Sequence, residues 1–221
     1  MIVLAIVAIL TAMAGSTAQQ IGARNATQNA ASDLSSVLQS ARARAEQRGT
    51  DVYVIVYPTA TKSPWALTGG PGAIFVYEDT NGNFITGSGP CDGTGTIDCS
   101  WGSFAPPNVV SPSTSGDRFI QAIYLEDYPK KNVKFGKPTG AFGAPYGGIG
   151  ALADTNGCSF CVAGNKGAIV FTGEQQLQFL NNAGAPMAQR VGGLALQAVD
   201  NPSRTFLFGL VAATGLVSVV R

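Results

Sequence analysis

The chain lacks histidine altogether, which excludes Ser-His-Asp and Cys-His catalysis and every zinc site that needs an imidazole ligand. Charge is also scarce, because Asp, Glu, Lys and Arg together make up 12% of the 221 residues, about half the usual share of a soluble domain. The net charge of +1 gives no overall field that would attract nucleic acid or an anionic membrane. The low charge suits a protein that is exported or packs against neighbours, and the lack of histidine counts against catalysis without excluding it. Because nothing in the sequence resembles a catalytic constellation, we expect no enzyme and no cofactor.

Charge is missing entirely from the first 23 residues, and no proline precedes Pro58. Residues 1–15 (MIVLAIVAILTAMAG) are apolar except for Thr11. A membrane-spanning helix needs about 20 apolar residues, so this run is short for a span. A secretory signal peptide would start with basic residues, which are absent here. Small residues that could form its cleavage site are nevertheless present: Ala12, Ala14 and Ala18.

Helical periodicity continues behind the apolar run. Five apolar side chains recur at the three- and four-residue spacing of one helix face: Leu34, Val37, Leu38, Ala41 and Ala45. Arginines occupy the last turns, where cations are favourable, and Gly49 is typical of a helix end. We predict one helix over residues 1–48, apolar in front and amphipathic behind, roughly 70 Å long at 1.5 Å per residue.

After Gly49 the apolar residues alternate instead, which predicts strands. The expected strands are 51–57, 73–78, 119–125, 133–135, 167–171, 177–180, 204–212 and 216–221. Asn81-Gly82 predicts a hairpin that returns along residues 83–85, and Thr214-Gly215 predicts a hairpin at the C-terminus. Residues 87–112 are rich in Gly, Ser and Pro and are expected to form a surface loop. The predicted fold is α+β, a long N-terminal helix packed on a C-terminal antiparallel β-sheet head.

The sequence resembles the type IV pilin-like proteins, and within them the minor pilins and pseudopilins of the GspH/FimT group. The resemblance rests on the apolar run, the helix end ARARAEQRG, the strand DVYVIVY and the strand that enters DTNG. It covers residues 1–82 and, through the C-terminal hairpin, residues 167–221. About 87–164 has no counterpart in the family.

The resemblance implies a structural subunit of a type IV pilus or a type II secretion pseudopilus. Residues 1–23 would anchor the chain in the membrane and then form the fibre core, residues 24–49 would continue the helix into the head, and residues 50–221 would form the β-rich head with a loop-rich insertion at about 87–164. The assembly helix would use the apolar side chains of Met1, Ile2, Val3, Leu4, Ile6, Val7, Ile9 and Leu10. In the family a basic leader, a cleavage site and Phe-Thr-Leu-Ile-Glu-Leu come before this run, so the sequence is expected to begin just after them.

The family also implies partners and a location. The partners are other pilins or pseudopilins in a fibre, the inner membrane before assembly, the prepilin peptidase and the inner-membrane assembly platform. The subunit would lie in the bacterial inner membrane with its head in the periplasm and then enter the fibre, and methylation of the mature N-terminus is a further family property. A pilus-tip receptor for DNA or a surface is one alternative, and a signal-cleaved, secreted β-rich protein is another.

The four cysteines favour disulfides, because an even number in an exported domain is typical of them. Cys91 and Cys99 form CDGTGTIDC, whereas Cys158 and Cys161 form CSFC, a spacing unlike paired zinc knuckles. We predict the local pairs 91–99 and 158–161, although sequence alone leaves the crossed pairing open. No βαβ pattern surrounds CSFC, so a thioredoxin-like redox role is not expected.

Two further motifs are predicted to be turns. DTNG occurs at 79–82 and at 154–157, and Asp79, Asn81 and Asn83 have the alternating oxygens of a calcium loop. The glycine comes too early and no glutamate follows at the twelfth position, so a turn is the simpler explanation and no metal site is predicted.

PKKNVKFGKP places four lysines around Phe135, a pattern that could bind single-stranded DNA by phosphate contacts and stacking: Lys130, Lys131, Lys134 and Lys137. Relatives that act in DNA uptake carry paired C-terminal arginines, but this chain has only Arg221 there.

Overall fold

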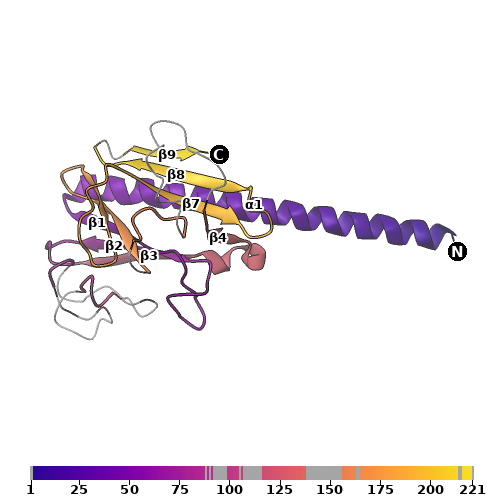
Figure 1. Cartoon of the computed structure of the whole chain (residues 1–221), viewed down its shortest axis with the longest axis horizontal. Coiled ribbons are helices and arrows are strands. Elements are labelled where there is room, and N and C mark those ends of the chain that lie inside the picture. The colour runs from indigo at the N-terminus through magenta and orange to yellow at the C-terminus, as the bar shows by residue number, and fades with distance from the viewer. Residues whose placement is uncertain are drawn as a thin grey trace.

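A single long helix carries a β-rich head in the computed structural model of the chain (Figure 1). The structure describes residues 2–87, 89, 91, 99–104, 106, 116–137, 156–162, 165–213 and 216–220, without the side chains of residues 2–24, 130, 216 and 220. Helix α1 spans Ile2–Arg48, as predicted, while Met1 lies outside the described residues. Residues 25–48 of α1 pack on antiparallel sheets, which confirms the predicted α+β fold and gives a pilin-like architecture.

The described residues form two antiparallel sheets where sequence predicted one. The first sheet has the order β3-β2-β1-β5-β6, and the second has the order β4-β7-β8-β9. The strands of the first are β1 (Asp51–Tyr57), β2 (Ala73–Asp79), β3 (Arg118–Tyr124), β5 (Gly167–Phe171) and β6 (Leu177–Leu180). Those of the second are β4 (Val133–Phe135), β7 (Val191–Ala198), β8 (Thr205–Val211) and β9 (Leu216–Val220). Two short 3₁₀ helices, η1 (Leu125–Asp127) and η2 (Pro129–Lys131), connect β3 to β4.

The predicted strands are all present within a few residues of their expected bounds, and β7 is the one that sequence reasoning missed. The C-terminal hairpin is confirmed by the antiparallel pairing of β8 with β9, although Thr214 and Gly215 lie outside the described residues. In β7, Gly192-Gly193 follow Val191 directly and no β-branched residue comes after it, so this strand lacks the composition that marked the other strands.

The hairpin predicted at Asn81-Gly82 is wrong. β2 pairs with β1 and β3, and no strand follows within residues 83–87. The Asp79 carboxylate instead accepts hydrogen bonds from the backbone N–H groups of Gly82 at 2.8 Å and Phe84 at 3.0 Å, which closes a turn. Phe84 is then buried against Tyr77, with ring centroids 4.7 Å apart. The chain therefore crosses the face of the sheet instead of extending it.

Both faces of the first sheet are covered. On one face, alternate side chains of β1 pack with α1 and the second sheet in a shared core. The other face holds an aromatic cluster in which Phe104 packs on Phe75 and Tyr77 of β2, and Trp101 packs on Phe84. Residues 101 and 104 belong to the stretch that was predicted to be a surface loop, so this stretch contributes side chains to the core, although Gly102 between them is exposed.

Candidate functional site: helix α1 and its surroundings

Helix α1 consists of two halves with different surroundings. Figure 1 shows that the leading half, residues 2–24, extends beyond the sheets, whereas the packed half, residues 25–48, lies against them. The apolar residues of the predicted assembly helix, apart from Met1, all belong to the leading half. Over the part of the chain whose side chains are described, which begins at residue 25 of α1, no helix combines the length and the hydropathy of a membrane span.

The packed half is fixed by its apolar stripe. All five residues of the predicted stripe are buried in the core shared with the sheets: Leu34, Val37, Leu38, Ala41 and Ala45. Ala26 and Ala30 continue the same face toward the leading half. Alanine lets the helix approach the sheets closely, while Leu34 and Leu38 fill the space between them.

A buried carboxylate fixes the C-terminal end of α1 to β2. Arg44 donates from Nε and Nη2 to Glu78 Oε2, at 2.8 and 2.6 Å. Thr50 donates to Glu78 Oε1 at 3.2 Å, and Nη1 of Arg48 lies 3.5 Å from the same oxygen. The Glu78 side chain is 0% exposed and that of Arg44 is 29% exposed, so both carboxylate oxygens are satisfied inside the protein. Such a pair holds its geometry because leaving the carboxylate unpaired would be costly.

A second polar contact lies nearer the middle of the helix. The Tyr128 hydroxyl donates to Asp33 Oδ2 at 2.6 Å and joins α1 to the segment between η1 and η2. Burial raises the pKa of Tyr128, and the hydrogen bond to the Asp33 carboxylate raises it further. The phenol therefore remains a donor throughout the ordinary pH range.

Both predicted disulfides are confirmed. Cys91 bonds to Cys99 and Cys158 bonds to Cys161, and all four residues are buried. Because the sulfurs are enclosed in the two apolar clusters, these bonds serve the packing of the head and are not placed for exchange with an external thiol.

The structure does not bring the lysine-rich segment together with an exposed aromatic ring. Phe135 is 5% exposed, because the alternation of β4 turns it and Val133 into the core and leaves Lys134 on the other side. Lys131 Nζ lies 3.5 Å from Glu126 Oε2, Lys137 is exposed, and the side chain of Lys130 lies outside the described residues. Phe135 is therefore not exposed for stacking with bases, while a contact of the lysines with nucleic acid stays an untested alternative.

The first DTNG motif is a hydrogen-bonded turn. Besides Asp79, the buried Asp117 contributes, since its Oδ1 accepts from the N–H and the hydroxyl of Thr80, both at 2.7 Å. Both carboxylates therefore serve donors of the chain itself, which favours the turn over a calcium loop. Among the described residues no cluster of acidic or cysteine side chains is arranged to hold a metal ion. In the second copy, Asp154 and Thr155 lie outside the described residues.

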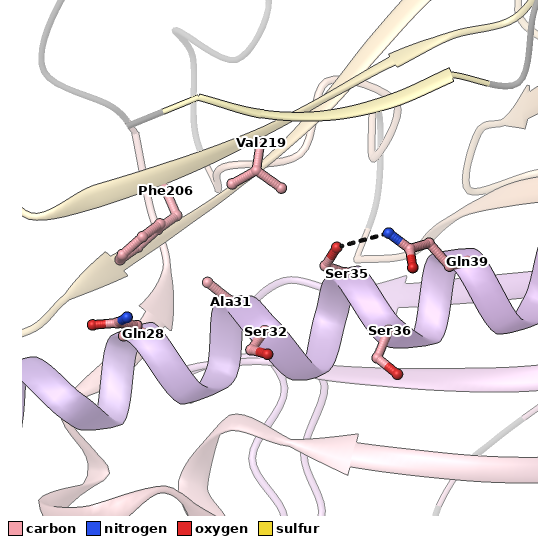
Figure 2. A pocket seen from close by; sticks show the side chains of 8 residues that line it. All are labelled: Gln28, Ala31, Ser32, Ser35, Ser36, Gln39, Phe206 and Val219. Carbon is pink, nitrogen blue, oxygen red and sulfur yellow. Dashed lines mark hydrogen bonds between the residues drawn. The ribbon is translucent and has the colours of Figure 1, made fainter.

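Two features carry no signal in the sequence. Lys166 Nζ donates to the Trp101 carbonyl at 2.6 Å and lies 4.3 Å from the centroid of the Trp101 indole, and burial lowers the pKa of Lys166 to about 8. The second feature is a groove of about 420 Å³ between α1 and the strands β8 and β9 (Figure 2). Both join residues that are far apart in the chain, so only the fold reveals them.

Comparison of the chain with protein-family models, with curated proteins and with solved structures gave no match. The pilin-like character of the molecule consists of its architecture, one N-terminal helix packed against antiparallel sheets.

Proposed function

We propose that the protein is a minor pilin or pseudopilin, a structural subunit that assembles into a fibre through the leading half of α1. The observation that carries this proposal is the contrast within one unbroken helix. The packed half completes the core of the head, while the leading half, which carries no charge before Arg24 and is apolar up to residue 15 except for Thr11, extends beyond it (Figure 1). An apolar helix outside its own head needs another apolar environment.

The mechanism that follows is transfer between two such environments. In the membrane, the backbone hydrogen bonds of the leading half are satisfied within the helix, and its aliphatic side chains face lipid. In a fibre, like helices from neighbouring subunits would replace the lipid. Each Leu, Ile or Val contributes about 0.3–0.6 kcal/mol to insertion at the centre of a span, whereas one Lys costs about 3 kcal/mol. A neutral run suits both states.

The head would move as one body with the helix. The buried contact between Arg44 and Glu78 and the contact between Tyr128 and Asp33 hold α1 to the head at two points. Withdrawal of the helix from a membrane would therefore carry the head along. The head would lie in the periplasm before assembly and on the fibre afterwards.

A charge placed in each half of α1 tests this proposal. Val7→Lys should release the full chain from the membrane fraction of its native host and abolish co-purification with fibres. The matched control is Ser40→Lys, which adds the same charge at an exposed position of the packed half and should keep both properties. Retention of Val7→Lys in membranes and fibres would contradict the proposal. A wild-type protein recovered outside the cell without residues 1–18 would instead support the secreted alternative.

A further inference from the structure

The groove beside α1 has two walls of different chemistry (Figure 2). One wall is the exposed face of the packed half of α1, and the other is the face of β8 and β9 that is turned toward the helix. The lining residues are Gln28, Ala31, Ser32, Ser35, Ser36, Gln39, Phe206 and Val219. Its volume of about 420 Å³ falls within the range of small-molecule sites, about 300–1,000 Å³.

The helix wall is polar and uncharged. Five of its six lining residues end in a hydroxyl or a carboxamide, groups that both donate and accept hydrogen bonds. Among the side chains that the structure describes, none that lines the groove is ionisable, and the carboxylate of the neighbouring Asp33 accepts the hydrogen bond of Tyr128 instead. An anionic or cationic ligand would therefore find no counter-charge among these lining residues. A purely apolar ligand would offer no partner to the hydroxyl and carboxamide groups, of which Gln39 Nε2 and Ser35 Oγ are hydrogen-bonded to each other at 3.5 Å.

The sheet wall is apolar. Phe206 comes from β8 and is half-buried, and Val219 comes from β9 and is 41% exposed. Val219 pairs across the strands with Phe208, a core residue, so Val219 lies on the core side of the sheet. Figure 2 places the Phe206 ring beside Gln28 at one end of the groove. A ligand there meets an aromatic ring and carboxamide groups together.

The polar residues also follow one line along the helix. Gln28, Ser32, Ser35 and Gln39 are spaced by three or four residues and so share a face, which extends for about 16 Å from residue 28 to residue 39 at a rise of 1.5 Å per residue. The groove is thus elongated and offers hydrogen-bonding groups at repeated intervals.

We infer that this groove binds a short neutral carbohydrate. A sugar chain presents hydroxyl groups that donate and accept, matching the Ser and Gln side chains, and its pyranose rings present C–H faces that pack on the electron-rich face of an aromatic ring such as Phe206. An extended neutral peptide is the nearest competitor. It fits less well, because its backbone groups need partners in strand register and the polar wall supplies only helical side chains. The inference is independent of fibre assembly.

The test uses the full chain in phosphocholine micelles, because a maltoside detergent would itself supply a sugar. Maltose, cellobiose and diacetylchitobiose serve as probes, measured by saturation-transfer NMR and by calorimetric titration. At least one should bind, and Gln28→Ala and Gln39→Ala should each weaken it by about 2- to 10-fold, the effect of one hydrogen bond. Phe206→Leu should weaken it by a similar factor. The matched control is Gln47→Ala, which removes the same group from an exposed position of the same helix outside the groove and should change nothing.

Three outcomes would overturn the inference. The first is no binding of any probe at about 10 mM, a concentration at which a Kd of 1 mM would give nearly full occupancy. The second is binding that the groove variants leave unchanged. The third is a neutral hexapeptide of Ser and Gln that binds in the groove when no sugar does. Gln28 and Gln39 are exposed, so their variants should unfold at the same temperature as the wild type, which separates lost binding from lost folding.

Discussion

The two halves of α1 share one continuous hydrogen-bonded helix but differ in what surrounds them (Figure 1). The packed half carries a narrow apolar stripe with polar and charged residues around it, and the sheets cover that stripe. The leading half up to residue 15 is apolar on every side and carries no charge. The head provides apolar surroundings for the packed half. No described part of the chain provides them for the leading half.

This difference shows why residue pattern, and not helix formation, separates the two roles. A helix that buries one stripe needs polar residues elsewhere, because those faces meet water. A helix that is apolar all round is suited to surroundings that are apolar all round, such as lipid or a bundle of helices. Among the described side chains, burial of α1 in the core begins at Ala26, shortly after the uncharged stretch ends at residue 23.

Truncating a leucine in each half of α1 should show the difference between the two halves most clearly. Leu38→Ala removes a fully buried side chain and should lower the free energy of unfolding of the head by about 3 kcal/mol. Leu10→Ala makes the same change in the leading half and should alter it by less than about 0.5 kcal/mol. Denaturant unfolding monitored by the fluorescence of Trp65 and Trp101 measures both. Equal losses in the two variants would contradict the division of α1.

Neutralising Glu78 should have the next largest effect. Glu78→Gln leaves Arg44 and Arg48 without their buried partner and should cost about 2 kcal/mol, less than for a fully enclosed pair because Arg44 still reaches water. The control is Glu46→Gln, which removes the exposed pair with Arg42 and should cost about 0.5 kcal/mol or less. If Glu78→Gln is as stable as the control in urea titrations, the buried pair of Glu78 with Arg44 does not stabilise the head.

Removing the Tyr128 hydroxyl should have a smaller effect. Tyr128→Phe deletes the donor to Asp33 while keeping the ring, and should cost about 1 kcal/mol because the acceptor remains in contact with water. Hydrogen exchange should then become faster in the part of α1 around Asp33 and remain unchanged near Arg44. Uniformly faster exchange along α1 would contradict the view that the contacts of Asp33 and of Arg44 hold the helix to the head independently.

A further prediction is a pH dependence that arises in the head alone. The pKa of Lys166 is lowered to about 8 by burial, below its ordinary value, so above pH 8 the unfolded chain binds more protons than the folded one. Stability should therefore rise modestly from about pH 8 to pH 10. Above pH 10 the buried Tyr53 and Tyr57, whose pKa values are raised by burial, should reverse the trend. Lys166→Met should remove the rise in urea titrations, and a persistent rise would assign it to another group.

Sequence predicted the parts of the fold that depend on local periodicity. The spacing of Leu34, Leu38, Ala41 and Ala45 identified both the helix and its buried face, and alternation identified most strands. Sequence reasoning missed β7 because its glycines interrupt the alternation of apolar residues. The hairpin predicted at Asn81-Gly82 does not form, because the Asp79 carboxylate accepts hydrogen bonds from the backbone N–H groups that follow it. The Asn-Gly signal is local and contains no information on where Phe84 is buried.

The candidate sites could not be predicted from the sequence, because each joins residues that lie far apart along the chain. Arg44 meets Glu78 34 residues further along, and the groove joins Gln28 to Phe206 and Val219. The local pairs Cys91–Cys99 and Cys158–Cys161 were predicted correctly, although sequence alone had left the crossed pairing open.

The most direct test of the division of α1 is a solvatochromic dye attached to one added cysteine in either half. Val7→Cys and Ser40→Cys variants of the full chain would be labelled with their native disulfides intact and then mixed with lipid vesicles. The account predicts that emission from position 7 shifts to shorter wavelength while emission from position 40 stays unchanged. Three results would contradict the claim that only the leading half enters apolar surroundings outside the head. These are an emission shift at both positions, a shift at position 40 alone, and no shift at position 7.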